Sequence, residues 1–256
     1  MKKTLWSLGV VVSALFVLSS CSPLKVSFSS SERQKIEECA LISTYLSIQL
    51  PVLPLLDAAV MNEKTRSMSN EINLLFEESI DGMREKVASL IKGRLNCSVI
   101  YGEALHQRPG FAAFKEKNNP AGVLVTGVDD FPEVISATDD VNPFMFENGN
   151  IAKYFKEPSN YRSTVIDICK ELDINYIIVT HTQLSPSPGS ILLPATLFNL
   201  TSVYLFDRNG TLLASGKNTL FIRYRATEFE GFEQALDIHE ATVAPIIDKI
   251  ADRYGN

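Results

Sequence analysis

The sequence predicts an α+β fold: a mixed, mainly antiparallel sheet, two or three amphipathic helices packed on one face, and a long irregular insertion. Three observations lead to this prediction. Segments with the period of a strand alternate with segments that have the period of a helix, and a strand–turn–strand pattern follows near the C-terminus. Between them, residues 103–158 are rich in proline and show neither period.

The composition is that of a globular protein. Of 256 residues, 45% are hydrophobic and 21% are charged, which is enough apolar surface for a sizeable core. The formal net charge is −6, so the chain has no basic surplus with which to bind a phosphate backbone. Disordered, collagen-like and nucleic-acid-binding proteins are therefore excluded.

The N-terminus has the pattern of an export signal. Lys2 and Lys3 precede an apolar run at 5–18, which is shorter than the roughly 20 residues of a spanning helix. The next residues, Leu18-Ser19-Ser20-Cys21, resemble the lipobox of bacterial lipoproteins. The resemblance implies cleavage after residue 20 and acylation of Cys21, whose acyl chains anchor the protein to a membrane. The resemblance also brings in the sorting rule of diderm lipoproteins, by which Ser22, rather than Asp, after the cysteine favours the outer membrane, with the protein facing the periplasm.

The mature chain is predicted to begin with a tether. Residues 21–35 are rich in serine and carry little hydrophobic pattern, so we expect a flexible connection at 21–35 and one α+β domain at 36–256. Loss of the signal peptide at 1–20 changes the net charge from −6 to −8. Attachment to a membrane must therefore come from lipid rather than from charge.

The first strand is predicted in the uncharged segment 39–56. Its apolar residues occupy alternate positions from Ile42 to Leu50, which indicates a strand with one buried face. Pro51 and Pro54 indicate that the strand ends there. A membrane-spanning segment is the less favoured alternative.

Helical periods follow. Apolar residues at steps of three and four predict an amphipathic helix over 70–96, with Ser69 or Asn70 as N-cap, and a second over 161–172. Each is followed by a short apolar run, at 97–101 and 174–180. The second run is rich in Ile and Val, so we expect a strand buried on both faces.

The C-terminal third predicts a hairpin and a final helix. Asp207-Arg208-Asn209-Gly210 separates two strand-like segments, and Asn and Gly tolerate the positive φ of a tight turn. Thr227 and Glu230 have the spacing of a capping box before a helical pattern that Pro245 is expected to bend.

These pieces resemble a group of envelope proteins that includes the N-terminal domain of the TolB translocation protein and the curli-secretion lipoprotein family. The resemblance covers residues 76–101, 161–180 and 203–213, each a helix–strand or hairpin unit. It implies a related α+β fold. Residues 103–158 depart from the group, which leaves a shared activity unsupported.

The insertion at 103–158 contains six of the 14 phenylalanines of the chain. Val123–Val128 predicts one strand within it. Two interpretations remain open: a packed cover over a sheet edge, or an aromatic surface that binds a partner. The candidate partner-binding residues are Phe111, Phe114, Phe131, Phe144, Phe146 and Phe155.

Motifs for chemistry are incomplete. His239-Glu240 lacks the second histidine of a zinc-protease helix, and His106 and His181 have no partner at ligand spacing. Asp129-Asp130 and Asp139-Asp140 are interpreted as solvated acidic loops rather than a calcium site. Cys39, Cys97 and Cys169 have no CxxC spacing and allow at most one bridge, for which Cys39 and Cys97 are candidates. We therefore expect no cofactor and no metal.

The sequence favours a non-catalytic, lipid-anchored binding or assembly factor that docks an envelope protein through the aromatic insertion at 103–158. Two alternatives remain: a subunit of an outer-membrane secretion pore or oligomer, and an envelope hydrolase without a recognisable motif.

Overall fold

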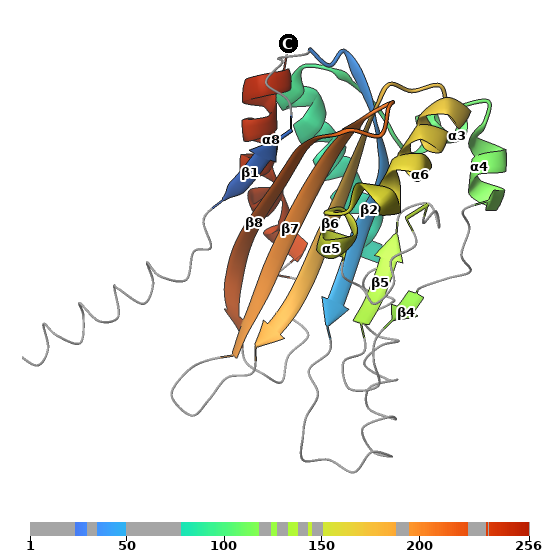
Figure 1. Cartoon of the computed structure of the whole chain (residues 1–256). Helices are drawn as coiled ribbons and strands as arrows, with labels where there is room; N and C mark the ends of the chain where they lie inside the picture. The colour runs from blue at the N-terminus through green and yellow to red at the C-terminus, as the bar shows by residue number, and fades with distance from the viewer. Residues whose placement is uncertain are drawn as a thin grey trace, which may run out of the picture.

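The computed structural model describes residues 24–29, 35–49, 78–117, 124–126, 133–137, 143–144, 151–187, 195–224, 234 and 236–255 (Figure 1). One sheet runs through these residues, and helices cover both of its faces. The lipobox, the predicted N-caps Ser69 and Asn70 and the capping box at Thr227 and Glu230 lie outside the described residues.

The sheet is mixed and mainly antiparallel, so the α+β prediction is confirmed. Its strands lie in the order β1-β8-β7-β6-β2-β5-β4, and β3 also pairs with β2. Strand β2 is parallel to β3 and β6, whereas every other pair is antiparallel. The bounds are β1 Lys25–Phe28, β2 Glu38–Gln49, β3 Ser98–Ile100, β4 Leu124–Thr126, β5 Glu133–Ala137, β6 Tyr176–Ser187, β7 Ala195–Asp207 and β8 Leu212–Tyr224.

Both predicted apolar strands form, but the prediction of a single buried face for β2 is wrong, because Ser43 and Ser47 are as fully buried as Leu46. Strand β2 ends at Gln49, close to Pro51, and lies between β5 and β6 in the sheet. In β6, Ile177, Ile178 and Val179 are each fully buried. Because consecutive residues of a strand face opposite sides, both faces of β6 must be covered.

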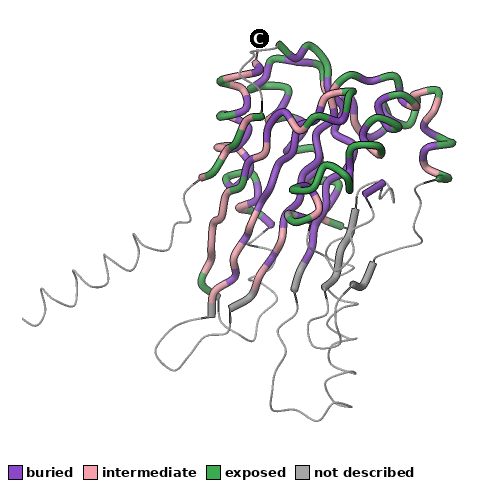
Figure 2. Tube along the Cα trace, in the orientation of Figure 1, coloured by how far each residue is buried: buried purple, intermediate pink, exposed green. Residues whose placement is uncertain are grey.

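Helices cover both faces of the sheet, so the prediction that they pack on one face is wrong. Ile177 and Val179 belong to one core, with residues of α3 (Glu103–His106), α4 (Phe111–Lys117), α5 (Ile151–Tyr154) and α6 (Pro158–Glu171). Ile178 belongs to a second core, with residues of the helix at 78–95 and of α8 (His239–Tyr254). Figure 2 shows buried chain running between exposed helical surfaces. A central strand that is apolar on both sides requires this arrangement.

The hairpin of β7 and β8 forms where predicted. Gly210 has φ 72°, which glycine adopts without strain, and the Asp207 carboxylate accepts hydrogen bonds from the backbone N–H groups of Asn209 and Thr211. In β8, a Cβ at Gly216 would lie 2.1 Å from Cγ2 of Ile246. Glycine at this position therefore allows α8 to pack closely against the sheet.

The insertion at 103–158 is more regular than predicted. It contributes α3, α4, β4, β5 and α5, and β5 pairs antiparallel with β2. Strand β4 confirms the strand predicted at 123–128. These elements are short, at most seven residues, and so they fit between the prolines that obscured their periods.

The tether prediction is wrong for residues 25–28. Lys25–Phe28 forms β1, which pairs with β8 from Lys217 to Ala214. The Phe28 ring lies 6.0 Å from that of Tyr254 and 4.8 Å from the Arg253 guanidinium. Backbone pairing and these contacts with α8 outweigh the low hydrophobicity that suggested a flexible segment.

None of the helices in the described part of the chain has the length and hydropathy to cross a membrane.

Candidate functional site

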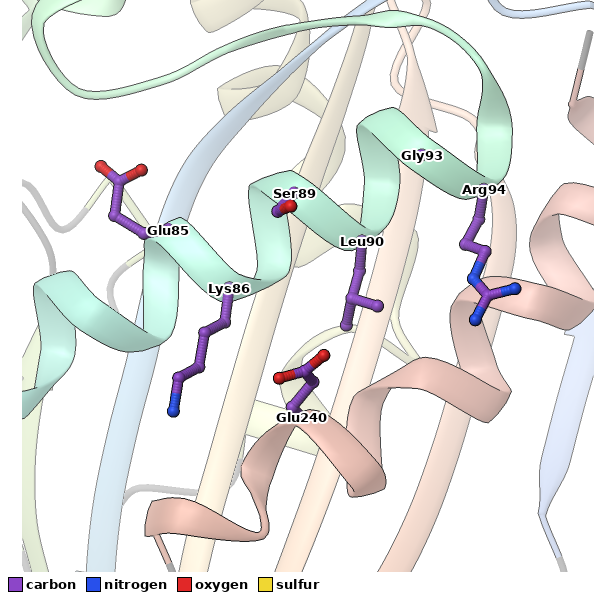
Figure 3. Close-up of a pocket in the computed structure, with 7 residues that line it drawn as sticks. All are labelled: Glu85, Lys86, Ser89, Leu90, Gly93, Arg94 and Glu240. Atoms are coloured by element: carbon purple, nitrogen blue, oxygen red, sulfur yellow. The ribbon is translucent and has the colours of Figure 1, made fainter.

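A groove of about 450 Å³ separates the helix at 78–95 from α8 (Figure 3). It lies on the outer side of the helix layer that covers one face of the sheet. Its lining residues are Glu85, Lys86, Ser89, Leu90, Gly93, Arg94 and Glu240.

The groove results from helix periodicity. Val87 and Ile91 are fully buried against the sheet, whereas Ser89 and Gly93, each two positions further along the helix, are exposed toward the groove. A Cβ built at Gly93 would have no neighbouring atom within 4 Å. The missing side chain therefore leaves open space beside Leu90.

The charges of the groove balance. It is lined by two carboxylates, Glu85 and Glu240, and by two cations, Lys86 and Arg94. Arg94 Nε lies 3.3 Å from a carboxylate oxygen of Asp248 in α8. Figure 3 shows the Lys86 side chain extending toward α8 and the Glu240 carboxylate directed toward the opposite helix. A surface with both signs of charge around one leucine is suited to a peptide segment rather than to a simple anion.

A buried histidine lies beside this groove. His239 is fully buried at the start of α8, next to Glu240, and neither ring nitrogen has a hydrogen-bond partner among the described residues. Burial, aided by the Lys86 cation, lowers the pKa of His239 to about 4. The imidazole is therefore neutral at pH 7 and supplies no charge to the groove.

The other histidines lie elsewhere. His181 Nε2 is 2.7 Å from Ser47 Oγ, a pair within the sheet, and burial with the Lys217 cation lowers the pKa of His181 to about 3. His106 lies in α3, with Nδ1 3.7 Å from a carboxylate oxygen of Glu103. The three histidines thus do not converge. Ser47 is fully buried and His181 is 5% exposed, so this pair has no open approach for a substrate.

Within the described ranges, no group of three His, Cys, Asp or Glu side chains is arranged to hold a metal ion. Asp129-Asp130 and Asp139-Asp140 lie outside these ranges.

Four of the six candidate phenylalanines lie in the core. Phe111, Phe114, Phe144 and Phe155 are between 0% and 6% exposed and pack in the cluster that covers one face of the sheet. The Phe155 ring lies 4.4 Å from that of Tyr204. These four residues are therefore packed rather than exposed, but against a face of the sheet and not over its edge. Phe131 and Phe146 lie outside the described residues, and their role in binding stays a prediction.

Cys21 also lies outside the described residues, so its acylation stays a prediction.

The sequence did not predict the groove. The sequence indicates both amphipathic helices, but Lys86 and Glu240 become neighbours only through tertiary packing. The sequence signal available for it was Gly93, a glycine inside a helical period.

Comparisons with known proteins identify no family. No protein-family model matches the chain, and no curated protein sequence matches it. Solved structures that it resembles include the PelC dodecamer from Paraburkholderia phytofirmans, at 7% identity and a TM-score of 0.37 over 91% of this chain and 99% of that one. A single-substitution variant of the same PelC dodecamer has a TM-score of 0.35 at 6% identity over 88% and 95% of the two chains.

A third structure is lipoprotein GNA1162 from Neisseria meningitidis, at 11% identity and a TM-score of 0.26 over 84% of this chain and 96% of that one. All three TM-scores are below 0.5. We therefore derive no functional conclusion from these structures.

Proposed function

We propose that this chain is a lipid-anchored lipoprotein of the bacterial cell envelope that acts as a non-catalytic binding or assembly factor. Its acyl chains on Cys21 insert into the outer membrane, and the folded domain faces the periplasm. A partner protein docks in the groove between the helix at 78–95 and α8.

The observation that carries this proposal is the position of β1. The strand begins at Lys25, only four positions after Cys21, and its backbone is paired with β8. Four residues of extended chain span at most about 14 Å. The first strand that the structure describes would therefore hold the folded domain close to an acylated Cys21, and a partner would be reached near the membrane surface.

The groove supports the docking part of the proposal. It is a concave surface of mixed charge beside α8, and α8 also contacts β1 through Tyr254 and Arg253. The docking surface and the proposed anchor are thus connected through one helix. By contrast, the four buried phenylalanines have too little exposed surface to serve as the main docking site.

The anchor is tested by metabolic labelling of cells with an alkyne fatty acid. We expect the wild-type chain to incorporate label and Cys21→Ala to lose it. Cys169→Ala is the matched control, since Cys169 lies in α6, and it should label like the wild type. Equal labelling of wild type and Cys21→Ala would contradict the anchor.

Docking is tested by placing a photo-crosslinking amino acid at Ser89 in intact cells. Ser89 is exposed in the groove, whereas Ser163 is exposed on α6, in the helix layer on the other face of the sheet. We expect the same envelope protein to be captured repeatedly from Ser89 and not from Ser163. Equal capture from both positions would show that the groove has no special role.

A further inference from the structure

Two cysteines from separate strands meet in the core. Cys39 lies in β2, opposite Val99 of the parallel strand β3. Cys97 precedes Val99 by two positions, so both cysteines belong to the same face of the sheet and to the same core cluster. Their Sγ atoms are 3.8 Å apart. An S–S bond is about 2.05 Å long, so a shift of less than about 2 Å brings the sulfurs to bonding distance.

The third described cysteine is separated from this pair. Cys169 lies in α6 and packs in the core on the opposite face of the sheet. The strand layer therefore lies between it and the other two thiols. The fold allows only the Cys39–Cys97 combination among the described cysteines.

We propose that Cys39 and Cys97 are a disulfide site of the folded protein, closed by thiol–disulfide exchange with a small disulfide donor. The reaction needs no metal or cofactor from the chain. It is independent of the proposed docking function, although an oxidising envelope would supply such donors.

The two thiols have different roles in the exchange. Cys97 is 7% exposed, against 1% for Cys39, and follows Asn96 at the end of the helix. A hydrogen bond from the Cys39 thiol lowers the pKa of Cys97, while this bond and burial raise the pKa of Cys39. Cys97 is therefore the first nucleophile.

The order of bond changes follows from that asymmetry. The Cys97 thiolate attacks one sulfur of the donor disulfide, forms a mixed disulfide and releases the first donor thiolate. Cys39 then loses its proton and attacks Cys97 Sγ, which forms the Cys39–Cys97 bond and releases the second donor thiolate. Two protein thiols are oxidised and one donor disulfide is reduced to two thiols.

The bond would join parts of the chain that are distant in sequence. The two cysteines are 58 positions apart, and Cys97 follows the helix that forms one wall of the groove. The disulfide would therefore fix the end of this helix to β2. Restricting so long a segment in the unfolded chain is the main way in which a disulfide stabilises a fold.

The site is tested on the purified full-length lipoprotein in detergent. The protein is fully reduced, freed of reductant, and incubated with oxidised glutathione. It is then denatured, alkylated and digested for peptide mass spectrometry. We expect a peptide linked between Cys39 and Cys97 and an alkylated Cys169. Alkylation of all three cysteines, or a link that includes Cys169, would overturn the proposal.

Variants provide a second readout. We expect the oxidised wild type to melt about 5–10 °C above the reduced protein. Cys169→Ala should keep this difference because it leaves the pair intact. Cys39→Ala should abolish it, and a glutathione adduct at Cys97, the first nucleophile, should replace the internal link. Equal melting temperatures of oxidised and reduced wild type would show that no stabilising disulfide forms.

Discussion

Polar side chains buried in the sheet are satisfied largely by one another. Ser47 and His181 are hydrogen-bonded across β2 and β6, and the hydroxyl groups of Thr182 and Thr201 lie 3.1 Å apart across β6 and β7. Such pairs compensate for the loss of hydration, which would otherwise cost several kcal/mol per group. This compensation depends on the protonation state, because burial and the nearby Lys217 cation keep the His181 imidazole neutral.

Stability should therefore fall in mild acid. An unfolded histidine binds a proton near pH 6.5, whereas in the folded chain His181 and His239 have pKa values of about 3 and about 4. The stability that depends on these neutral histidines is fully present above pH 6.5. It is lost as the pH falls from 6.5 toward 4, because in this range the histidines of the unfolded chain gain protons and those of the folded chain do not. At pH 5 the loss is about 2 kcal/mol per histidine.

Urea unfolding of the wild type at pH 7 and pH 5 measures this loss. We expect His181→Gln and His239→Gln each to reduce the difference in unfolding free energy between the two pH values. His106→Gln, on the surface of α3, is the control and should retain the full difference. A wild type that is equally stable at both pH values would contradict the neutral, buried state of the two histidines.

At the scale of elements, the packing of two helices determines the shape of the groove. The ion pair of Arg94 and Asp248 connects them, but its side chains are 55% and 48% exposed, so it contributes less than about 1 kcal/mol. The buried residues Ile91 and Ile247, which belong to the same core, hold the helices in place. The width of the groove is thus set by packing beneath it rather than by the charges along its edge.

Two glycines of the helix at 78–95 offer a matched test of docking. Neither Gly82 nor Gly93 would bring a Cβ within 4 Å of a neighbouring atom, and only Gly93 lines the groove. We expect both Gly82→Leu and Gly93→Leu to stabilise the helix by about 0.5–1 kcal/mol. Only Gly93→Leu should reduce photo-crosslinking from Ser89, by severalfold, because its side chain fills the groove.

Thermal melting and the crosslinking yield together check this expectation. Equal melting temperatures of the two variants with different crosslinking yields would support docking in the groove. If Gly93→Leu crosslinks as well as Gly82→Leu, the partner does not occupy the space beside Leu90.

At the scale of the whole molecule, the sheet begins close to the proposed anchor. Strand β1 is an edge strand, held by β8 and by the contacts of Phe28 with α8. The start of β1 is thereby kept within about 14 Å of Cys21. This arrangement would limit the reach of the proposed docking surface in a way that a flexible tether would not.

Lengthening the connection should separate anchoring from docking. We expect six Gly/Ser residues inserted between Leu24 and Lys25 to preserve β1 and the melting temperature, but to weaken capture of a partner from Ser89. The same insertion after Gly255, beyond α8, is the control and should have no effect on capture. Unchanged capture with the longer connection would show that the short distance to the membrane is unimportant.

The sequence by itself determined the local structure of this protein. The alternating pattern of β2, the helical period of α6 and the turn at Asp207–Gly210 each depend on residues close together in the chain, and so they were predictable. The α+β class and the mainly antiparallel sheet followed from their order. The composition of 103–158 also showed that the segment contains many aromatics, but not on which side they pack.

Tertiary structure decided the features that join distant segments. Packing on both faces of β6 buried Phe114 and Phe155, whereas composition alone was also consistent with an exposed aromatic binding surface. Tertiary packing also brought Cys97 close to Cys39 and placed α8 beside the helix at 78–95. The physical reason is that hydrophobic period specifies which residues turn inward. The partner that each inward face meets depends on the order of strands in the sheet, which long-range pairing sets.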